Sequence, residues 1–330
     1  MKTDGRLGKT DAVSSSAHTF DPKNKLIAVT GAAGTLGGLI CRMLLGHGAE
    51  LILLDRNPEK SKRRETELKS EFPSAKIHRI SVDLADISSV TSATERLKKF
   101  PLSGFIHCAG AYHIKRELSP LGVDNVFQIN FVSPYCMIRE LIPVLEKPKK
   151  ESGGETLVGI VSSIAAGFSS ADRNDIDFKK RRSHEKVYGN AKRYLTFSVF
   201  ELLKDRDLPL TAAAHPGVTP TGITSHYPRF ASSLIKYPMR LIFPSPEKAA
   251  RSLTEGFLEP SGCFKWVGPK YFGIWGPPER SDTCKCSEAE REFIFRTAEA
   301  LFEKMKSAAI KGEAEQAIQN QNTEKKGERL

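Results

Sequence analysis

Short apolar segments rich in β-branched residues alternate with amphipathic segments along most of the chain. The first, Lys25–Thr30, precedes a helical pattern over 35–47, and a second apolar segment follows at Glu50–Asp55. Strands that are apolar throughout are buried on both faces, and parallel strands need a crossover helix between them. The alternation therefore predicts a doubly wound α/β fold, in which helices cover both faces of a parallel sheet.

The same alternation continues to about residue 268. Further strands are predicted at 76–82, 104–109, 156–163, 208–214 and 263–268, and further helices at 57–72, 87–99, 120–146 (as a pair) and 186–205. We expect a single three-layer α/β/α domain over residues 25–283, for which the 39% hydrophobic content is ample.

The two ends of the chain differ from this pattern. Residues 1–24 are rich in Ser, Thr, Asp and Gly without an apolar period, which predicts a disordered leader. Residues 284–330 begin with an amphipathic helix containing Phe293, Ile294 and Leu301, and fade into a polar tail. We expect this helix to pack on the domain, while an oligomer contact or a membrane-surface contact stays open.

Composition excludes several classes of function. The formal charge of +11 comes with short, separate basic runs that lack interleaved aromatic residues, so we expect no nucleic-acid partner. No stretch approaches the roughly 18 apolar residues of a membrane span, and no secretory signal is present, so we expect a cytoplasmic protein without a transmembrane segment. The six cysteines show neither a disulfide framework nor a zinc pattern, so we expect no metal.

A glycine-rich segment, Val29–Gly38, joins the first strand to the first helix. Glycines allow a tight turn and a close approach of backbone to a pyrophosphate, and the helix N-terminus offers free N–H groups. Asp55 follows about twenty positions later, where dinucleotide sites place a carboxylate. The segment predicts a dinucleotide-binding loop with contacts from Gly31, Gly34, Thr35, Leu36 and Gly37.

The end of the second strand bears on which nicotinamide cofactor binds. The carboxylate of Asp55 can accept hydrogen bonds from an adenosine ribose and repels a 2′-phosphate, which favours NAD. Arg56 stands beside it and can pair with that phosphate, so NADP stays open. Asp83 and Leu84, at the end of the third strand, are placed to meet the adenine ring.

Tyr188 and Lys192 are four positions apart on a predicted helix, so their side chains share one face. A phenol is a weak acid at neutral pH, and a neighbouring ammonium lowers its pKa by stabilising the phenolate. The strand before this helix carries Ser162 and Ser163 to its carboxyl end, where doubly wound sheets bind their ligands.

At this point the chain resembles the short-chain dehydrogenase/reductase family over about residues 25–270, which implies a Rossmann-type fold. The motifs occur in the family's order: TGAAGTLG, Asp83-Leu84, Cys108-Ala109-Gly110, Asn130, VSSIA, YGNAK and HPGVTPT. The resemblance implies an enzyme, and it suggests a homo-oligomer.

The resemblance also assigns roles. Tyr188 would be the acid/base, Lys192 its activator and a ribose ligand, Ser163 the hydroxyl that orients the substrate oxygen, and Asn130 the holder of a water in a proton relay. Further cofactor contacts would come from Cys108, Ala109, Gly110, Pro216, Gly217, Val218, Thr219 and Thr221. Together these residues imply hydride transfer between nicotinamide and an alcohol or carbonyl, without a metal.

Three features depart from the usual family pattern. The glycines follow TGxxGxxG, a spacing more typical of sugar-nucleotide epimerases, and Cys108 replaces the usual asparagine. The interval 164–187 is about twice the usual length and resembles the loop of retinol dehydrogenase relatives; a surface excursion without a catalytic role is the alternative.

The main hypothesis is thus an NAD(P)-dependent oxidoreductase acting on a small-molecule alcohol or ketone. A segment at about 219–245 mixes aromatic and aliphatic residues, which predicts a lid over an apolar pocket and so a hydrophobic substrate. Two alternatives stay open: a sugar-nucleotide epimerase or dehydratase with tightly held NAD, and a non-catalytic NAD(P) sensor.

Overall fold

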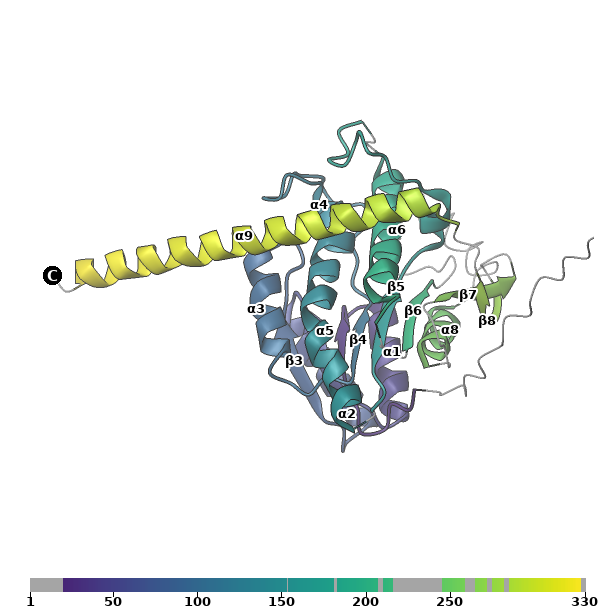
Figure 1. Ribbon diagram of the computed structural model, residues 1–330. Helices are drawn as coiled ribbons and strands as arrows, with labels where there is room; N and C mark the ends of the chain where they lie inside the picture. The colour runs from purple at the N-terminus through teal and green to yellow at the C-terminus, as the bar shows by residue number, and fades with distance from the viewer. Residues whose placement is uncertain are drawn as a thin grey trace, which may run out of the picture.

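The computed structural model describes residues 20–152, 154–180, 183–206, 210–215, 245–258, 265–271, 275–281 and 285–327. Within these residues the strands form one eight-stranded sheet in the order β3-β2-β1-β4-β5-β6-β7-β8 (Figure 1). All neighbouring strands are parallel except β7 and β8. The strands are β1 (Leu26–Thr30), β2 (Glu50–Asp55), β3 (Ile77–Ser81), β4 (Gly104–His107), β5 (Leu157–Val161), β6 (Leu210–Ala214), β7 (Lys265–Tyr271) and β8 (Trp275–Ser281).

Helices cover both faces of the sheet and divide the core in two. One face packs against α1 (Thr35–Gly46), α2 (Pro58–Glu71) and α8 (Pro246–Leu258), and the other against α3 (Ile87–Leu97), α5 (Ser133–Ser152) and α6 (His184–Leu203). Strand β1 contributes side chains to both cores, because its successive side chains alternate between the two faces. This arrangement confirms the predicted doubly wound α/β/α fold.

Short polar side chains cap the first turns of α2 and α3. The Asn57 carboxamide accepts a hydrogen bond from Lys60 N at 2.9 Å, and Pro58 follows at a position where its missing N–H costs nothing. The Asp86 carboxylate caps α3 in the same way, accepting from Ser88 N at 2.9 Å. Each cap stabilises its helix by about 1 kcal/mol.

The predicted helix pair at 120–146 is instead one continuous helical segment. It begins with α4 (Asn125–Phe127), passes through a π-helical turn, η1 (Gln128–Val132), and continues as α5. Hydrophobic periodicity cannot separate a π turn from a break between helices, because both shift the apolar face. Asn130 lies inside this turn, and π turns are frequent at functional sites.

A long C-terminal helix, α9 (Glu288–Gly327), crosses the outer side of α6 and α3 and extends past the body of the domain (Figure 1). Its inner face enters the core that α3, α5 and α6 share, through Ile294, Ala298, Leu301, Phe302 and Met305. In the part of the chain that the structure describes, no helix is long and apolar enough to cross a bilayer.

Three further features were absent from the sequence predictions. Helix α8 and the antiparallel strand β8 were not predicted, and Pro277 and Pro278 make β8 atypical of a strand. Within the predicted leader, Phe20 is buried and its N–H donates to Leu258 O, so the packed body extends at least to Phe20.

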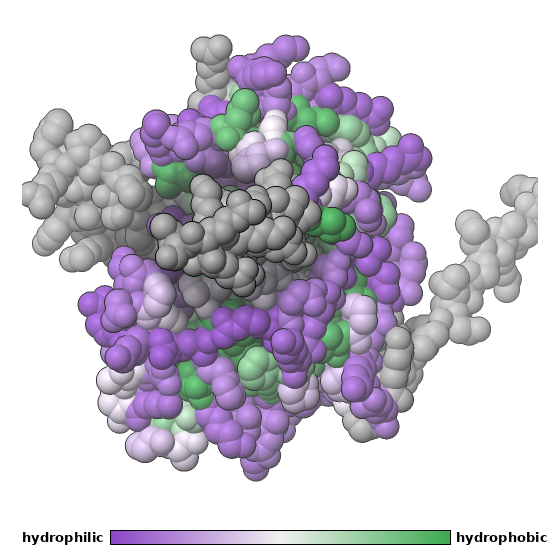
Figure 2. Space-filling model, turned by 90° about the vertical axis from the view of Figure 1, so that its left-hand side faces the viewer, coloured by the Kyte–Doolittle hydropathy of each residue, from purple (hydrophilic) through white to green (hydrophobic). Residues whose placement is uncertain are grey.

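The face in Figure 2 is mainly hydrophilic, with hydrophobic residues scattered between polar ones.

Candidate active site

The glycine-rich loop joins β1 to α1, and its glycines pack closely against neighbouring backbone. Gly31 has φ +70°, a conformation that side chains disfavour, and a Cβ there would lie 2.8 Å from Ala109 Cα. A Cβ on Gly37 would overlap the Gly31 carbonyl. Gly34 caps α1 without a side-chain hydrogen bond, and the first turn carries no acidic residue, so this helix N-terminus favours an anion.

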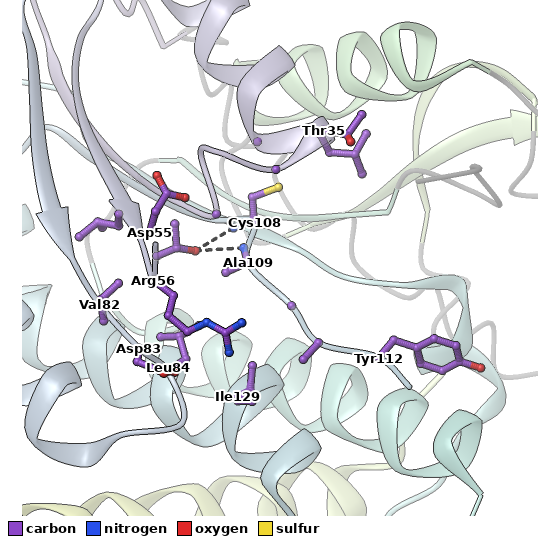
Figure 3. A pocket seen from close by; sticks show the side chains of 18 of the residues that line it. Thr35, Asp55, Arg56, Val82, Asp83, Leu84, Cys108, Ala109, Tyr112 and Ile129 are labelled. Atoms are coloured by element: carbon purple, nitrogen blue, oxygen red, sulfur yellow. Dashed lines mark hydrogen bonds between the residues drawn. The ribbon is translucent and has the colours of Figure 1, made fainter. Parts of the chain in front are cut away.

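A cavity of about 430 Å³ opens beside this loop, at the carboxyl ends of the parallel strands (Figure 3). The lining includes the predicted contacts Gly31, Gly34, Thr35, Leu36, Gly37, Asp55, Arg56, Asp83, Leu84, Cys108, Ala109 and Gly110. It also includes Thr30, Leu54, Val82, Ala111, Tyr112, Ile114 and Ile129, which are not among the predicted contacts.

Asp55 and Arg56 hold different positions at this cavity. The Asp55 carboxylate accepts hydrogen bonds from Ala33 N at 2.8 Å and from Ser61 Oγ at 2.9 Å, so it braces the glycine loop. Burial raises the pKa of Asp55, although these two hydrogen bonds oppose the rise. The Arg56 guanidinium points into the cavity, toward the space between Ala109 and Ile129 (Figure 3).

Thr30 holds the turn in which Cys108 replaces the family's asparagine. Its Oγ1 accepts hydrogen bonds from Cys108 N and Ala109 N, both at 3.1 Å, and it lies 2.9 Å from His107 Nδ1. Burial lowers the pKa of His107 well below its usual value, so the imidazole is neutral and its Nδ1 can accept from the Thr30 hydroxyl. The turn is therefore held through its backbone, independently of the side chain at 108.

Asn130 is held in place by hydrogen bonds to backbone groups. Its Nδ2 donates to Ala111 O at 2.6 Å and to Val126 O at 2.8 Å, and its Oδ1 accepts from Ala111 N at 3.2 Å. The carboxamide thereby joins the η1 turn to the strand end that carries Gly110 and Ala111. Its buried side chain fixes this wall of the cavity.

Ser163, Tyr188 and Lys192 come together just beyond the end of the cavity. The Ser163 side chain lies close enough to the Tyr188 phenol to lower its pKa, and Lys192 Nζ lies 5.7 Å from the centre of the Tyr188 ring. Lys192 Nζ also donates to Val161 O at 3.0 Å. A Cβ on Gly110, which lines the cavity, would lie 3.6 Å from Lys192 Nζ, so the cavity and the triad are neighbours.

The two serines at the end of β5 point to different places. Ser162 is buried, and its Oγ lies 2.7 Å from Thr196 Oγ1 on α6. Ser163 is the serine that acts on the pKa of Tyr188, and its Oγ accepts a hydrogen bond from Ala165 N at 3.2 Å. The structure thus places Ser163, the predicted catalytic serine, next to the phenol.

Burial sets the acidities of this group. It lowers the pKa of Lys192 to about 8 and raises the pKa of Tyr188 to about 12, although the bond from Ser163 favours the phenolate. Desolvation is therefore the largest influence on the pKa of Tyr188, and the role of Lys192 as its activator stays a prediction.

The long interval after Ser163 is integrated into the fold where the structure describes it. Phe178 is buried against Phe127, and its carbonyl accepts from the Arg116 guanidinium at 3.4 Å. His184, at the start of α6, stacks on His113 with ring centres 4.4 Å apart. The insertion therefore contacts the domain at Phe178, whereas Phe168 is 86% exposed.

The predicted nicotinamide contacts Pro216, Gly217, Val218, Thr219 and Thr221 lie outside the described residues. The same holds for nearly all of the predicted lid at 219–245. Among the described residues, no group of three His, Cys, Asp or Glu side chains is arranged to hold a metal ion.

Comparison with known proteins agrees with this geometry. The family model described as "short chain dehydrogenase" matches residues 25–173. The chain is 27% identical over 292 residues to the short-chain dehydrogenase/reductase pkfC of Emericella nidulans, covering 83% of this chain and 92% of that one. It is 23% identical over 273 residues to polyprenol dehydrogenase of Mus musculus, covering 81% of each.

A similar fold occurs in a solved structure of a putative uncharacterized protein from Mycobacterium Paratuberculosis. The two superpose with a TM-score of 0.67 at 19% identity, covering 87% of this chain and 96% of the other. At this identity the likeness concerns the fold alone.

Proposed function

The chain belongs to the short-chain dehydrogenase/reductase family and is an oxidoreductase of that family, and from this premise we propose that it interconverts an apolar alcohol and its carbonyl compound, with Tyr188 as acid/base. The observation that carries the proposal is the meeting of Ser163, Tyr188 and Lys192 beside the glycine-lined cavity. This arrangement supports a hydroxyl or carbonyl carbon held between the cavity and the phenol.

The residues present fit a nicotinamide dinucleotide. The loop can fold this tightly only because Gly31 and Gly37 lack side chains. The start of α1 presents free N–H groups, and no acidic residue in its first turn competes with an anion for them. Gly31, Gly34, Thr35, Leu36 and Gly37 would hold the pyrophosphate, and Asp83 and Leu84 the adenine. When bound, the nicotinamide ring supplies or accepts the hydride.

The protein's own groups would handle the proton. Tyr188 gives its hydroxyl proton to the substrate oxygen in reduction and takes it back in oxidation, and Ser163 donates a second hydrogen bond to the same oxygen. Lys192 would hold a cofactor ribose and favour the phenolate. Asn130 fixes the adjacent turn, and we propose that its carboxamide region also holds the relay water.

We propose NAD as the preferred cofactor. A 2′-phosphate near Asp55 would face a carboxylate that the fold needs for bracing Ala33 and Ser61. Arg56 acts in the other direction, because its guanidinium points into the cavity and can pair with a phosphate.

A variant of Arg56 tests this preference without disturbing the brace. Arg56→Ala should weaken NADP binding about tenfold or more and leave NAD binding nearly unchanged, since only NADP carries the extra phosphate. Titration with each cofactor, followed by quenching of protein fluorescence, measures the two dissociation constants. Equal losses for both cofactors would show that Arg56 does not meet the 2′-phosphate.

The substrate is proposed to be hydrophobic. The sequence at 219–245 supports this, and one relative is named for a polyprenol, a long isoprenoid alcohol. A panel of candidate substrates should therefore range from cyclohexanol and 2-decanol to farnesol, and should include the carbonyl counterpart of each alcohol.

The panel experiment follows the absorbance of reduced nicotinamide with NAD and NADP in parallel. Steady, stoichiometric consumption of added cofactor with an alcohol or carbonyl supports the proposal.

The glycine spacing favours one second candidate, a sugar-nucleotide epimerase or dehydratase. Such an enzyme would turn over sugar nucleotides without consuming added cofactor. A protein that binds cofactor and turns over neither class would instead fit a sensor of NAD(P).

A further inference from the structure

Arg193 directly follows Lys192 on α6, and its side chain is only 3% exposed. Its guanidinium makes a two-point ion pair with the Glu290 carboxylate, with both N···O distances 2.7 Å. It also donates to Ala166 O at 3.0 Å and to Lys285 O at 2.9 Å. One side chain therefore joins α6 to the segment after Ser163 and to the start of α9.

Glu290, in the first turn of α9, joins the same segments from the other side. Besides pairing with Arg193, its Oε1 accepts a hydrogen bond from Ala171 N at 2.8 Å. Burial alone would raise the pKa of Glu290, but these hydrogen bonds hold it below its usual value, so the carboxylate is charged. The pair is separated by 97 positions in the sequence.

The segment that this pair holds begins at Ser163. Ser163 caps the short 3-10 helix η2 (Ile164–Phe168), to which Ala166 belongs. The same segment is held against α6 by Asn190, whose Nδ2 donates to Ser170 O at 2.6 Å, and Gly189 leaves room for Ala165 and Ser169. Residues 163–171 are thus fastened to the helix of Tyr188 on one side and to α9 on the other.

We propose that Arg193 and Glu290 are positioning residues that couple the docking of α9 to the placement of Ser163 opposite Tyr188. The proposal rests on the function proposed above, in which Ser163 and Tyr188 act on one substrate oxygen. The C-terminal helix is then part of the catalytic unit, and its first turn determines how residues 163–171 are held.

The chemistry of the pair explains why both residues are needed. Arginine presents several N–H donors in a fixed plane, and here they bind one carboxylate and two carbonyls at once. The compact ammonium of lysine cannot reach all of these acceptors in this geometry. Neutralising Glu290 leaves a buried guanidinium without its counter-charge, and the groups closest to that charge must rearrange.

Amide hydrogen exchange of the full chain tests the coupling without any substrate. In Glu290→Gln, amides of residues 163–171 should exchange at least tenfold faster, while strands β1, β2 and β4 keep the parent's protection. Glu292→Gln is the matched control, because Glu292 lies on the same helix turn in an exposed pair with Arg296 and should change neither region. Unchanged exchange at 163–171 in a folded Glu290→Gln protein would overturn the proposal.

A second variant covers the case in which Glu290→Gln fails to fold and every segment exchanges quickly. Glu290→Asp keeps the charge but shortens the reach, so exchange should rise at 163–171 while the sheet stays protected. If Glu290→Asp also left 163–171 as protected as in the parent, α9 would not position this segment.

Kinetics with the fastest compound of the panel then separates a positioning role from a purely structural one. Glu290→Gln and Arg193→Lys should lower kcat about tenfold and leave the KM for the cofactor unchanged, because the nucleotide cavity lies apart from the pair. An equal rise in cofactor KM would contradict local positioning. If no compound is turned over, the proposed function fails, and the exchange result still decides whether the pair holds residues 163–171.

Discussion

The side chain of Lys192 is buried, which disfavours its charged form. Its side chain is 2% exposed, its Nζ donates to one backbone carbonyl, and burial lowers its pKa to about 8 from an ordinary value of 10.5. Between these two pH values the unfolded chain is protonated at Lys192 while the folded protein is largely not. Stability should therefore rise with pH across this window, because the unfolded state binds more protons there.

Comparison with Lys192→Met tests this linkage. Between about pH 7.5 and pH 9.5, the free energy of unfolding of the parent should rise by about 2 kcal/mol relative to that of Lys192→Met, since the variant has no charge to bury. Urea unfolding at both pH values measures the difference, and other titrating groups cancel between the two proteins. A constant difference would mean that Lys192 keeps an ordinary pKa in the folded state.

Thr30 is the residue on which the turn at the cavity depends. Thr30→Val should lose its hydrogen bonds to Cys108 N, Ala109 N and His107, lowering stability by about 1–3 kcal/mol and weakening cofactor binding. Thr91→Val is the control, because Thr91 Oγ1 bonds only its own helix at Ile87 O. Urea unfolding and cofactor titration provide the measurements; equal losses in both variants would contradict a special role for Thr30.

At the scale of elements, helix α1 contains two glycines that differ in the space available for a side chain. A Cβ on Gly37 would overlap Gly31 O, whereas a Cβ on Gly46 would meet nothing within 4 Å. Gly37→Ala should therefore destabilise the loop and reduce cofactor affinity at least tenfold. Gly46→Ala should leave affinity unchanged and stability unchanged or slightly higher, since alanine favours helix. Cofactor titration with both variants decides whether the loop needs glycine at 37 specifically.

The elements also show what the sequence could and could not predict. The strands β1 to β7 and the helices α1 to α3 follow from hydrophobic periodicity, and the glycine loop follows from its place between a strand and a helix. Helix α8 and strand β8 were missed, and the π turn at Asn130 was not foreseen, because local patterns do not encode a bulge. The pairing of Arg193 with Glu290 depends on tertiary contact over a long sequence separation, which no local pattern carries.

At the scale of the whole molecule, α9 behaves as part of the domain core. Ile294 is fully buried in the core that α3, α5 and α6 share, whereas Ile310 on the same helix is 65% exposed. Ile294→Ala should lower the free energy of unfolding by about 2–5 kcal/mol in a single cooperative transition, and Ile310→Ala by much less. Urea unfolding of both variants measures this. A separate early transition in Ile294→Ala would show that α9 unfolds independently of the sheet.

At the scale of the whole molecule, Ser163, Tyr188 and Lys192 lie at the end of the cavity that the glycine-rich loop lines, and Glu290 of the C-terminal helix contacts the segment that follows Ser163. The central claim is that Tyr188 transfers the proton. Tyr188→Phe should reduce kcat about 10²- to 10⁴-fold while cofactor affinity changes little, because the variant loses only the hydroxyl. Tyr194→Phe lies six residues further along α6, with its ring packed against Phe127 and Phe131, and should keep the parent's turnover. Turnover of Tyr188→Phe at the parent's rate, with the best compound of the panel, would contradict the mechanism.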